Sequence, residues 1–185
     1  MGSVPILQGK RVLLRPPCEK DKQDRLALGR NAEFVRMCGG DHRNLQPFTP
    51  EQAERWYARL VAEPLEWVIE VNGRCIGTAR LHHMDEENRR IRYAIGIFDP
   101  LAWGQGFGTE ATRLVLRHAF DGLNLHRVDL KVLDYNHRAI ACYEQCGFQR
   151  EGIDREGAWI AGQWQSDLLM SILEQEYRAI APTWG

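Results

Sequence analysis

The sequence lacks most of the features that mark the large functional classes. No segment approaches the roughly 18 consecutive apolar residues of a membrane span. The net charge of −1 and the absence of a long basic block give no electrostatic surface for nucleic acid. The five cysteines include no Cys-x-x-Cys spacing. These absences argue against membrane and nucleic-acid partners and against the commonest cysteine motifs.

The chain has the length and composition of a folded domain. With 185 residues, 44% of them hydrophobic, it is long enough to bury a core, so we expect residues 1–185 to form a single domain. No signal-peptide pattern opens the chain and free thiols fit a reducing compartment, so we expect a cytoplasmic protein. Cys142 and Cys146 share a helical face and are expected to fill the core. His82 and His83 lie near Asp85 and Glu86, but adjacent histidines rarely bind one ion without more partners, so no metal site is expected.

A glycine-rich run, Trp103–Ala111, has glycine at three alternate positions between an extended apolar segment and a helical pattern. A helix begins with backbone N–H groups that have no partner, and its dipole favours negative charge there. Glycine lets a phosphate approach those groups without a Cβ in the way. The spacing fits neither the dinucleotide fingerprint nor the Gly-Lys-Ser/Thr loop. The run therefore predicts a different kind of pyrophosphate-binding loop; the alternative is a glycine-rich turn with no ligand.

A second motif, Asn136–Phe148, follows the strand pattern Val128–Val132. Asn136 is suited to cap a helix, and Gly147 to end it in a left-handed conformation. Tyr143 lies seven residues after Asn136, about 10 Å further along the same helical face. By themselves, these residues could be only a helix cap and a core aromatic.

Together the two motifs resemble the GNAT superfamily of acyl-CoA N-acetyltransferases. The resemblance rests on the glycines of Gly104–Gly108, followed by Asn-x-x-Ala-x-x-x-Tyr-x-x-x-Gly-Phe over Asn136–Phe148. It is strongest to the branch that holds ribosomal-protein N-terminal and spermidine acetyltransferases, which Glu151–Ile153 and Gly162–Asp167 also suit. The resemblance covers about residues 9 to 178, almost the whole chain.

The resemblance implies a mixed α/β fold, with a central mixed sheet splayed between two middle strands and helices on both faces. The strands Ile91–Phe98 and Val128–Leu133 would diverge, and the pantetheine arm of acetyl-CoA would lie between them. This is physically consistent, because a splayed strand leaves N–H and C=O groups that need a partner. The implied coenzyme-binding residues are Ile95, Ile97, Trp103, Gly104, Gln105, Gly106, Phe107, Gly108, Thr109, Asn136 and Tyr143.

The implied reaction is acetyl transfer from the thioester of acetyl-CoA to an amine, without a covalent enzyme intermediate. Tyr143 is the candidate acid, since the family places this tyrosine beside the coenzyme sulfur. A thiol has a pKa near 8.5 and a phenol near 10, so Tyr143 could act mainly as a hydrogen-bond donor to the forming thiolate. Asn136 would orient the pantetheine or bind a water molecule. Arg113 and Arg138 could add charge near the phosphates, although solvated surface positions suit both.

The general base is not indicated. Many members of this branch carry a glutamate just before the Ile-Gly pair of the central strand, where this chain has Ala94. A primary amine with a pKa near 10.4 is deprotonated only about one part in 2,500 at pH 7, so some group must take the proton. The residues expected nearby are Glu70, His82, His83, Asp85 and Glu86. A water relay, a shifted acceptor or the loss of activity would also explain Ala94.

The sequence leaves several possibilities for the molecule that accepts the acetyl group. We expect Asn31–Phe48, His82–Asn88 and a hairpin with Trp159 and Trp164 to line its pocket. Possible anchors for a cationic amine such as a polyamine or aminoglycoside are Glu33, Asp41, Asp85, Glu86 and Glu87. A protein N-terminus as acceptor, or a coenzyme-binding module without catalysis, are the alternatives. Relatives are often dimers, which suggests a homodimer.

The periodicity of the chain also predicts its elements. Strands are expected at Arg11–Arg15, Trp67–Val71, Cys75–Leu81, Ile91–Phe98, Val128–Leu133, Phe148–Ile153 and Trp164–Leu173. Helices are expected near Asp21–Leu28, Ala32–Met37, Pro50–Ala62, Gly108–Asp121 and Asn136–Cys146. Asn72-Gly73 between two strands predicts a tight hairpin turn.

Overall fold

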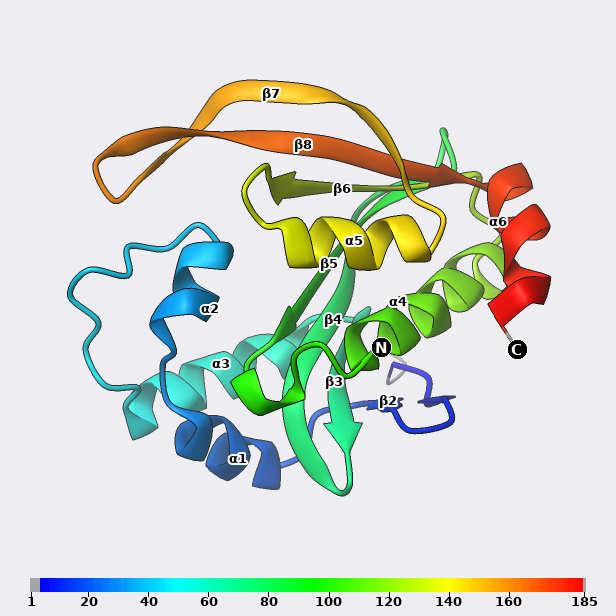
Figure 1. The fold of residues 1–185 in the computed structure, drawn as a ribbon. Helices are drawn as coiled ribbons and strands as arrows, with labels where there is room; N and C mark the ends of the chain where they lie inside the picture. Colours follow the sequence, from blue (N-terminus) through cyan, green and yellow to red (C-terminus); the bar gives the residue numbers. More distant parts are fainter. Residues whose placement is uncertain (1–3, 185) are drawn as a thin grey trace.

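The computed structural model describes residues 4–184, which form one eight-stranded mixed sheet with helices on both faces (Figure 1). The strands are β1 (Leu7–Gln8), β2 (Leu13–Arg15), β3 (Glu66–Val71), β4 (Arg74–Asp85), β5 (Arg90–Ile97), β6 (Arg127–Leu133), β7 (Gln149–Ile160) and β8 (Gln163–Leu173). They lie in the order β1-β2-β3-β4-β5-β6-β8-β7. The mixed α/β fold predicted from the sequence is confirmed.

Six α-helices pack on this sheet: α1 (Lys20–Leu28), α2 (Ala32–Met37), α3 (Pro50–Ala62), α4 (Phe107–Arg117), α5 (His137–Gln145) and α6 (Glu174–Ile180). Local chemistry fixes several of their ends. Thr49 and Gln52 form the capping box that their spacing predicts at the start of α3. The Asn136 side chain caps α5 by accepting the backbone N–H of Ala139.

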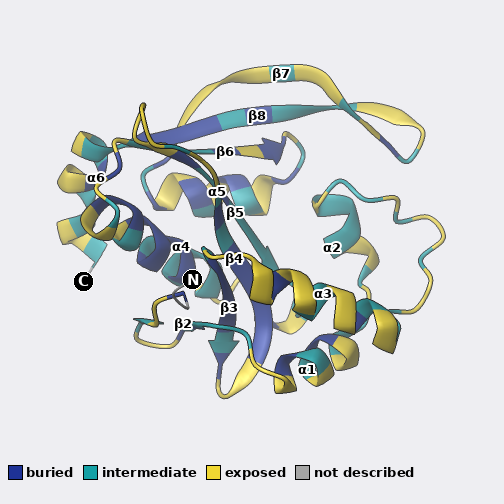
Figure 2. Ribbon diagram, turned by 180° about the vertical axis from the view of Figure 1, so that it is seen from behind, coloured by how far each residue is buried: buried dark blue, intermediate teal, exposed yellow. Residues whose placement is uncertain are grey.

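The alternation of side chains in β3 divides the core between the two faces of the sheet. Trp67 and Ile69 belong to the main core cluster, together with Val115 of α4. Val68 points to the other face, where it packs with Leu60 of α3. Figure 2 shows the resulting pattern: the central strands are buried, and β7 at the outer edge is largely exposed.

The central strands β5 and β6 are parallel and pair only at their start. The last paired residues are Arg92 and Asp129, and beyond them the strands diverge (Figure 1). On its other side β5 stays paired with β4 as far as Ile97, and β6 stays paired with β8 as far as Leu133. The predicted splay therefore exists, and it leaves the facing edges of β5 and β6 without a strand partner.

Some elements differ from those expected. β7 runs to Ile160, seven residues beyond the expected end, because its pairing with β8 continues past an irregularity between Asp154 and Ala158. After Arg117 the predicted long helix widens into a π-helical turn over His118–Gly122. The short β1 and the helix α6 were not predicted. No helix in residues 4–184 is long and apolar enough to cross a membrane.

Candidate active site

The glycine-rich run forms a loop that leads into the first turn of α4. Gly104 and Gly106 have φ angles of +73° and +83°, a conformation that side chains with a Cβ rarely adopt. Gly106 directly precedes the helix, so its neighbouring N–H groups are those without a partner inside the helix. A Cβ added to Gly106 would lie 3.1 Å from Nη2 of Arg11. Gly104, Gly106 and Gly108 line the cavity beside these N–H groups, an arrangement that suits an anionic ligand.

Arg11 adds a positive charge to this loop that sequence reasoning missed. Its guanidinium donates to the carbonyl of Gln105 over 3.0 Å and lies 4.9 Å from the centre of the Phe107 ring. Arg11 precedes the loop by more than 90 residues, and it reaches the loop because β2 and α4 pack together. Glu110 in the first turn of α4 holds it there, accepting the backbone N–H of Arg11 over 2.7 Å.

Tyr143 lies on the buried face of α5, and its side chain is only 6% exposed. Its ring packs edge-on against Tyr93 of β5, with centroids 6.3 Å apart. The Tyr93 hydroxyl pairs with Thr112, whereas that of Tyr143 has no hydrogen-bond partner among residues 4–184. Burial raises the pKa of the Tyr143 phenol well above its usual value. Tyr143 therefore remains protonated at any physiological pH.

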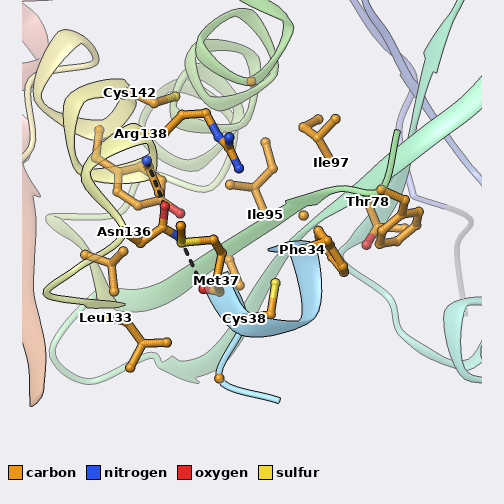
Figure 3. Close-up of a pocket in the computed structure, with 18 of the residues that line it drawn as sticks. Phe34, Met37, Cys38, Thr78, Ile95, Ile97, Leu133, Asn136, Arg138 and Cys142 are labelled. Carbon is orange, nitrogen blue, oxygen red and sulfur yellow. Dashed lines mark hydrogen bonds between the residues drawn. The ribbon is translucent and has the colours of Figure 1, made fainter. Parts of the chain in front are cut away.

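Asn136 connects α5 to α2. Its side-chain oxygen caps α5, and its side-chain amide donates to the carbonyl of Met37 over 3.2 Å (Figure 3). The neighbouring Tyr135 hydroxyl donates to the carbonyl of Arg36 over 2.9 Å. The capping interpretation of Asn136 is thus correct, and its second role in the structure is to fix α2 beside the divergent strands.

These elements surround one cavity of about 980 Å³. In Figure 3 side chains from α2, β5 and α5 converge on it. Nine of the eleven residues predicted to bind the coenzyme line it: Ile95, Ile97, Trp103, Gly104, Gly106, Gly108, Thr109, Asn136 and Tyr143. Gln105 and Phe107 do not line it. The Gln105 side chain turns back to donate to the carbonyl of Leu101.

The backbone carbonyl of Ile97, which is predicted to pair with the coenzyme, already accepts one hydrogen bond within the protein. The Trp103 indole donates to the carbonyl of Ile97 over 2.9 Å, so one lone pair of that oxygen is used within the protein. Arg138 lies 3.9 Å from the centre of the Trp103 ring and forms a 3.3 Å ion pair with Glu33. Arg138 therefore lines the cavity and is not merely a solvated surface residue.

None of the groups suggested as a general base lines the cavity. Glu70 is bound by Arg15 over 2.5 Å, and Asp85 faces Asn88 and Arg90 on the surface. His82 and His83 lie side by side, and burial lowers the pKa of His82 to about 4.

The expected acidic anchors for a cationic acceptor also lie elsewhere, because all five carboxylates are outside the cavity lining. Glu33 pairs with Arg138, and Asp41 pairs with Arg43. Of the expected pocket segments, α2 and Trp159 line the cavity, whereas His82–Asn88 and Trp164 do not.

The cavity instead carries charges that sequence reasoning missed. Glu66 of β3 is only 2% exposed and receives two hydrogen bonds from Arg59 of α3, at 2.5 and 3.1 Å. Arg80 of β4 and Asp167 of β8 also line it. Burial raises the pKa of the Asp167 carboxyl. These residues come from separate strands, so no spacing in the sequence marks them as neighbours.

Comparisons with known proteins agree with this geometry. Residues 11–149 match the acetyltransferase (GNAT) domain family. The chain is 32% identical to the spermidine N(1)-acetyltransferase of Escherichia coli over 119 residues, which are 64% of this chain and 63% of that protein. It is 30% identical to a ribosomal N-acetyltransferase-like protein of Bacillus subtilis over 123 residues, 66% of each chain.

A solved structure is also similar over almost its whole length. It is the spermidine N-acetyltransferase of Vibrio cholerae in complex with CoA and spermine, which matches with a TM-score of 0.75 and 26% identity. The match covers 92% of this chain and 99% of that one.

Proposed function

The chain belongs to the acetyltransferase (GNAT) family and is an acetyl-CoA-dependent N-acetyltransferase, and from this premise we propose that it acetylates the primary amine of a small molecule. The observation that carries the proposal is the single cavity that joins the glycine-rich loop and the splayed strands to a second half lined by charged side chains. That second half is lined by residues of α2, α3 and the β7–β8 hairpin, and its charged side chains suit the polar groups of a small acceptor.

We assign coenzyme binding to two sets of backbone groups. Amides at the start of α4 would hold the pyrophosphate, aided by the charge of Arg11. The free edge of β5 beyond Arg92 would pair with the amides of the pantetheine arm. Gly104 and Gly106 make the loop accessible, because neither carries a Cβ toward the ligand.

We assign Tyr143 to the departing sulfur. In the reaction the amine nitrogen forms a bond to the acetyl carbon, the carbon–sulfur bond breaks, and the sulfur gains a proton while the nitrogen loses one. The bound thioester supplies the acetyl group. Because the pKa of Tyr143 is raised by burial, its hydroxyl is a poor proton donor but a permanent hydrogen-bond donor. It would stabilise the forming thiolate without becoming ionised, in agreement with its lack of an internal partner.

We assign Asn136 a positioning role in the active site. Its amide connects α5 to α2 and so sets the width of the cavity beside Tyr143. One N–H of that amide remains available for the pantetheine or for a bound water molecule.

The experiment that tests the function is acetyl-CoA turnover by the purified protein, read as free thiol, against polyamines, aminoglycosides, amino acids and N-terminal peptides. Saturable turnover with a small amine supports the proposal. Turnover with peptides alone supports the second candidate, a protein N-terminal acetyltransferase, which the ribosomal N-acetyltransferase-like relative favours. Binding of acetyl-CoA with no turnover on any amine would indicate a non-catalytic module.

Three expectations remain predictions: a single domain over residues 1–185, a homodimer and a cytoplasmic location. The continuous sheet, whose order links the first strands to the last, supports a single domain. A surface on which two copies could meet is the tip of the β7–β8 hairpin. There Trp159 and Trp164 pack together with ring centres 5.0 Å apart and more than half of each side chain exposed. Light scattering of the protein and of a Trp164→Ser variant would test the dimer.

A further inference from the structure

Some of the charged side chains that line the cavity have partners inside the protein, and others have none. It is lined by five cations and two carboxylates: Arg25, Arg59, Arg80, Lys131, Arg138, and Glu66 and Asp167. Most of these have partners inside the protein. Arg59 binds Glu66, Lys131 binds Asp154 over 2.7 Å, and Arg138 binds Glu33.

The positive charge of Arg25 is stabilised by aromatic rings and a backbone carbonyl in place of a carboxylate. Its guanidinium lies 4.0 Å from the centre of the Phe48 ring and 4.6 Å from that of Phe98, and it donates to the carbonyl of Gly29 over 2.5 Å. Two groups are then left. Within residues 4–184, neither Arg80 nor Asp167 has an ion pair or a side-chain hydrogen bond, although both line the cavity.

The register of the sheet explains why Arg80 lacks a partner. Glu66, Arg80 and Ala94 are directly opposite one another on β3, β4 and β5, so their side chains share one face. Glu66 on one side is occupied by Arg59, which binds both of its oxygens. Ala94 on the other side has no charge. Since Arg80 lines the cavity and has no carboxylate partner, its guanidinium is suited to bind an anion that enters the cavity.

Asp167 lies across the splay from Arg80. It pairs in register with Leu133 on β6, beyond the point where β5 and β6 separate. Its neighbour Lys131 donates to Asp154 instead, so the Asp167 carboxylate lines the cavity with Lys131 nearby but with no ion pair or hydrogen bond to it. A carboxylate in this state is suited to receive an ammonium group.

We propose that the acceptor is an amine that also carries a carboxylate, with Arg80 binding the carboxylate and Asp167 receiving the ammonium group. The unpaired Arg80 supports this, because a polycation such as spermidine would meet its positive charge, whereas Arg59, Lys131 and Arg138 are neutralised by carboxylates of the protein. The proposal rests on small-amine acetylation as the function, and it selects zwitterionic acceptors within that class.

The test compares acceptors that differ in the carboxylate alone. Each ω-amino acid from glycine to 6-aminohexanoate is paired with the alkylamine in which hydrogen replaces the carboxylate. Lysine is paired with cadaverine in the same way. We expect kcat/KM to be at least tenfold higher for the carboxylate member of the best pair. The chain length at which this ratio peaks would measure the spacing between the two binding groups.

The variant Arg80→Gln should lower that ratio at least tenfold. The matched control is Arg74→Gln on the same strand, where the arginine is exposed beside the β3–β4 turn and does not line the cavity. A readout that does not depend on turnover is calorimetric binding of the N-acetylated product of the best pair in the presence of CoA. Arg80→Gln should weaken it by a similar factor, and Arg74→Gln should not.

The variant Ala94→Glu should act in the opposite direction. It places a carboxylate opposite Arg80, so Arg80 becomes paired and the preference should move toward cadaverine and other cationic acceptors. Turnover with amines but equal rates for every pair, or a ratio that Arg80→Gln leaves unchanged, would overturn this proposal while leaving the acetyltransferase function intact. Absence of turnover with every amine would instead overturn the proposed function.

Discussion

The two halves of the cavity are built in different ways. The half assigned to the coenzyme uses backbone groups of two short stretches, residues 95–109 and 136–143. The half assigned to the acceptor uses side chains of α1, α2, α3, β3, β4, β6, β7 and β8. Backbone donors held by glycine recognise a ligand that does not vary. Side chains from many elements can be exchanged one at a time, so the charge of the acceptor half can change while the fold and the coenzyme half stay the same.

The relatives illustrate this difference. The Vibrio cholerae enzyme has the same fold over 92% of this chain and was solved with CoA and spermine, a polycation. In this chain the charged residues that line the cavity are five cations and two carboxylates, and three of the cations are paired with carboxylates within the protein. The shared fold therefore says little about the acceptor, and the comparison between halves is best tested by variants that affect one half alone.

The largest effect is expected for Gly106→Asp in the coenzyme half. The variant forces a Cβ toward Arg11 at a φ of +83° and adds a carboxylate to the anion-binding loop. We expect acetyl-CoA affinity to fall at least about 100-fold, measured by calorimetry. The matched control is Gly73→Asp, which has a similar φ of +74° in the β3–β4 turn and no neighbour within 4 Å. Equal losses for both variants would mean that backbone strain alone is responsible.

The second largest effect is expected for Tyr143→Phe, which tests the role of Tyr143 in acetyl transfer. Tyr143→Phe should lower kcat about 100-fold while the dissociation constant of acetyl-CoA changes by less than about threefold. Its control is Tyr93→Phe, which removes a hydroxyl bonded to Thr112 over 2.9 Å and should cost about 1 kcal/mol of folding free energy with little effect on kcat. Because burial raises the pKa of Tyr143, the rate should show no alkaline loss attributable to this group up to pH 10. A kcat equal to that of the parent would remove Tyr143 from the mechanism.

A smaller effect concerns the buried ion pair of the acceptor half. Arg59→Gln should destabilise the fold by about 3 kcal/mol, because it leaves Glu66, only 2% exposed, as an uncompensated buried charge. Glu66→Gln should cost only about 1 kcal/mol, because the Arg59 side chain is 42% exposed and stays hydrated. Urea unfolding at pH 7 measures both values. The reverse order would show that Arg59, and not Glu66, is the poorly hydrated partner.

The smallest effect is expected for Asp167→Asn. Because burial raises the pKa of this carboxyl, the charged form destabilises the folded state once the pH exceeds that raised pKa. The variant should therefore gain stability at pH 7, by less than about 1 kcal/mol since the group is partly solvated, and gain none near pH 3, where both states are protonated. Urea unfolding at the two pH values would check this. A gain of equal size at both pH values would point to packing and not to charge.

Much of the coenzyme half could be predicted from the sequence. The glycine run, the cap at Asn136 and the buried face of α5 are local features, each contained within about a dozen residues. The apolar residues that share one face of α4, Ala111, Leu114 and Val115, are buried. The helix period and the cap chemistry determine these positions without help from the rest of the chain.

The acceptor half could not be predicted, and β4 shows why. A two-residue Asn72-Gly73 turn with Val71 opposite Arg74 would place Glu66 opposite Ala79. A bulge at Ile76 adds one residue, so Glu66 lies opposite Arg80 instead. A shift of one residue reverses the face on which every later side chain of the strand lies.

The sequence by itself determined the loop, the helix ends and the family of this protein, because these depend on neighbours in the chain. Only the tertiary structure decided that Arg80 joins Glu66 and Ala94 on one face, and that Asp167 faces the same cavity from β8. The physical reason is that strand register and splay depend on how the whole sheet packs against its helices. That Arg80 and Asp167, 87 residues apart in the sequence, line one cavity follows from that packing and from no local pattern.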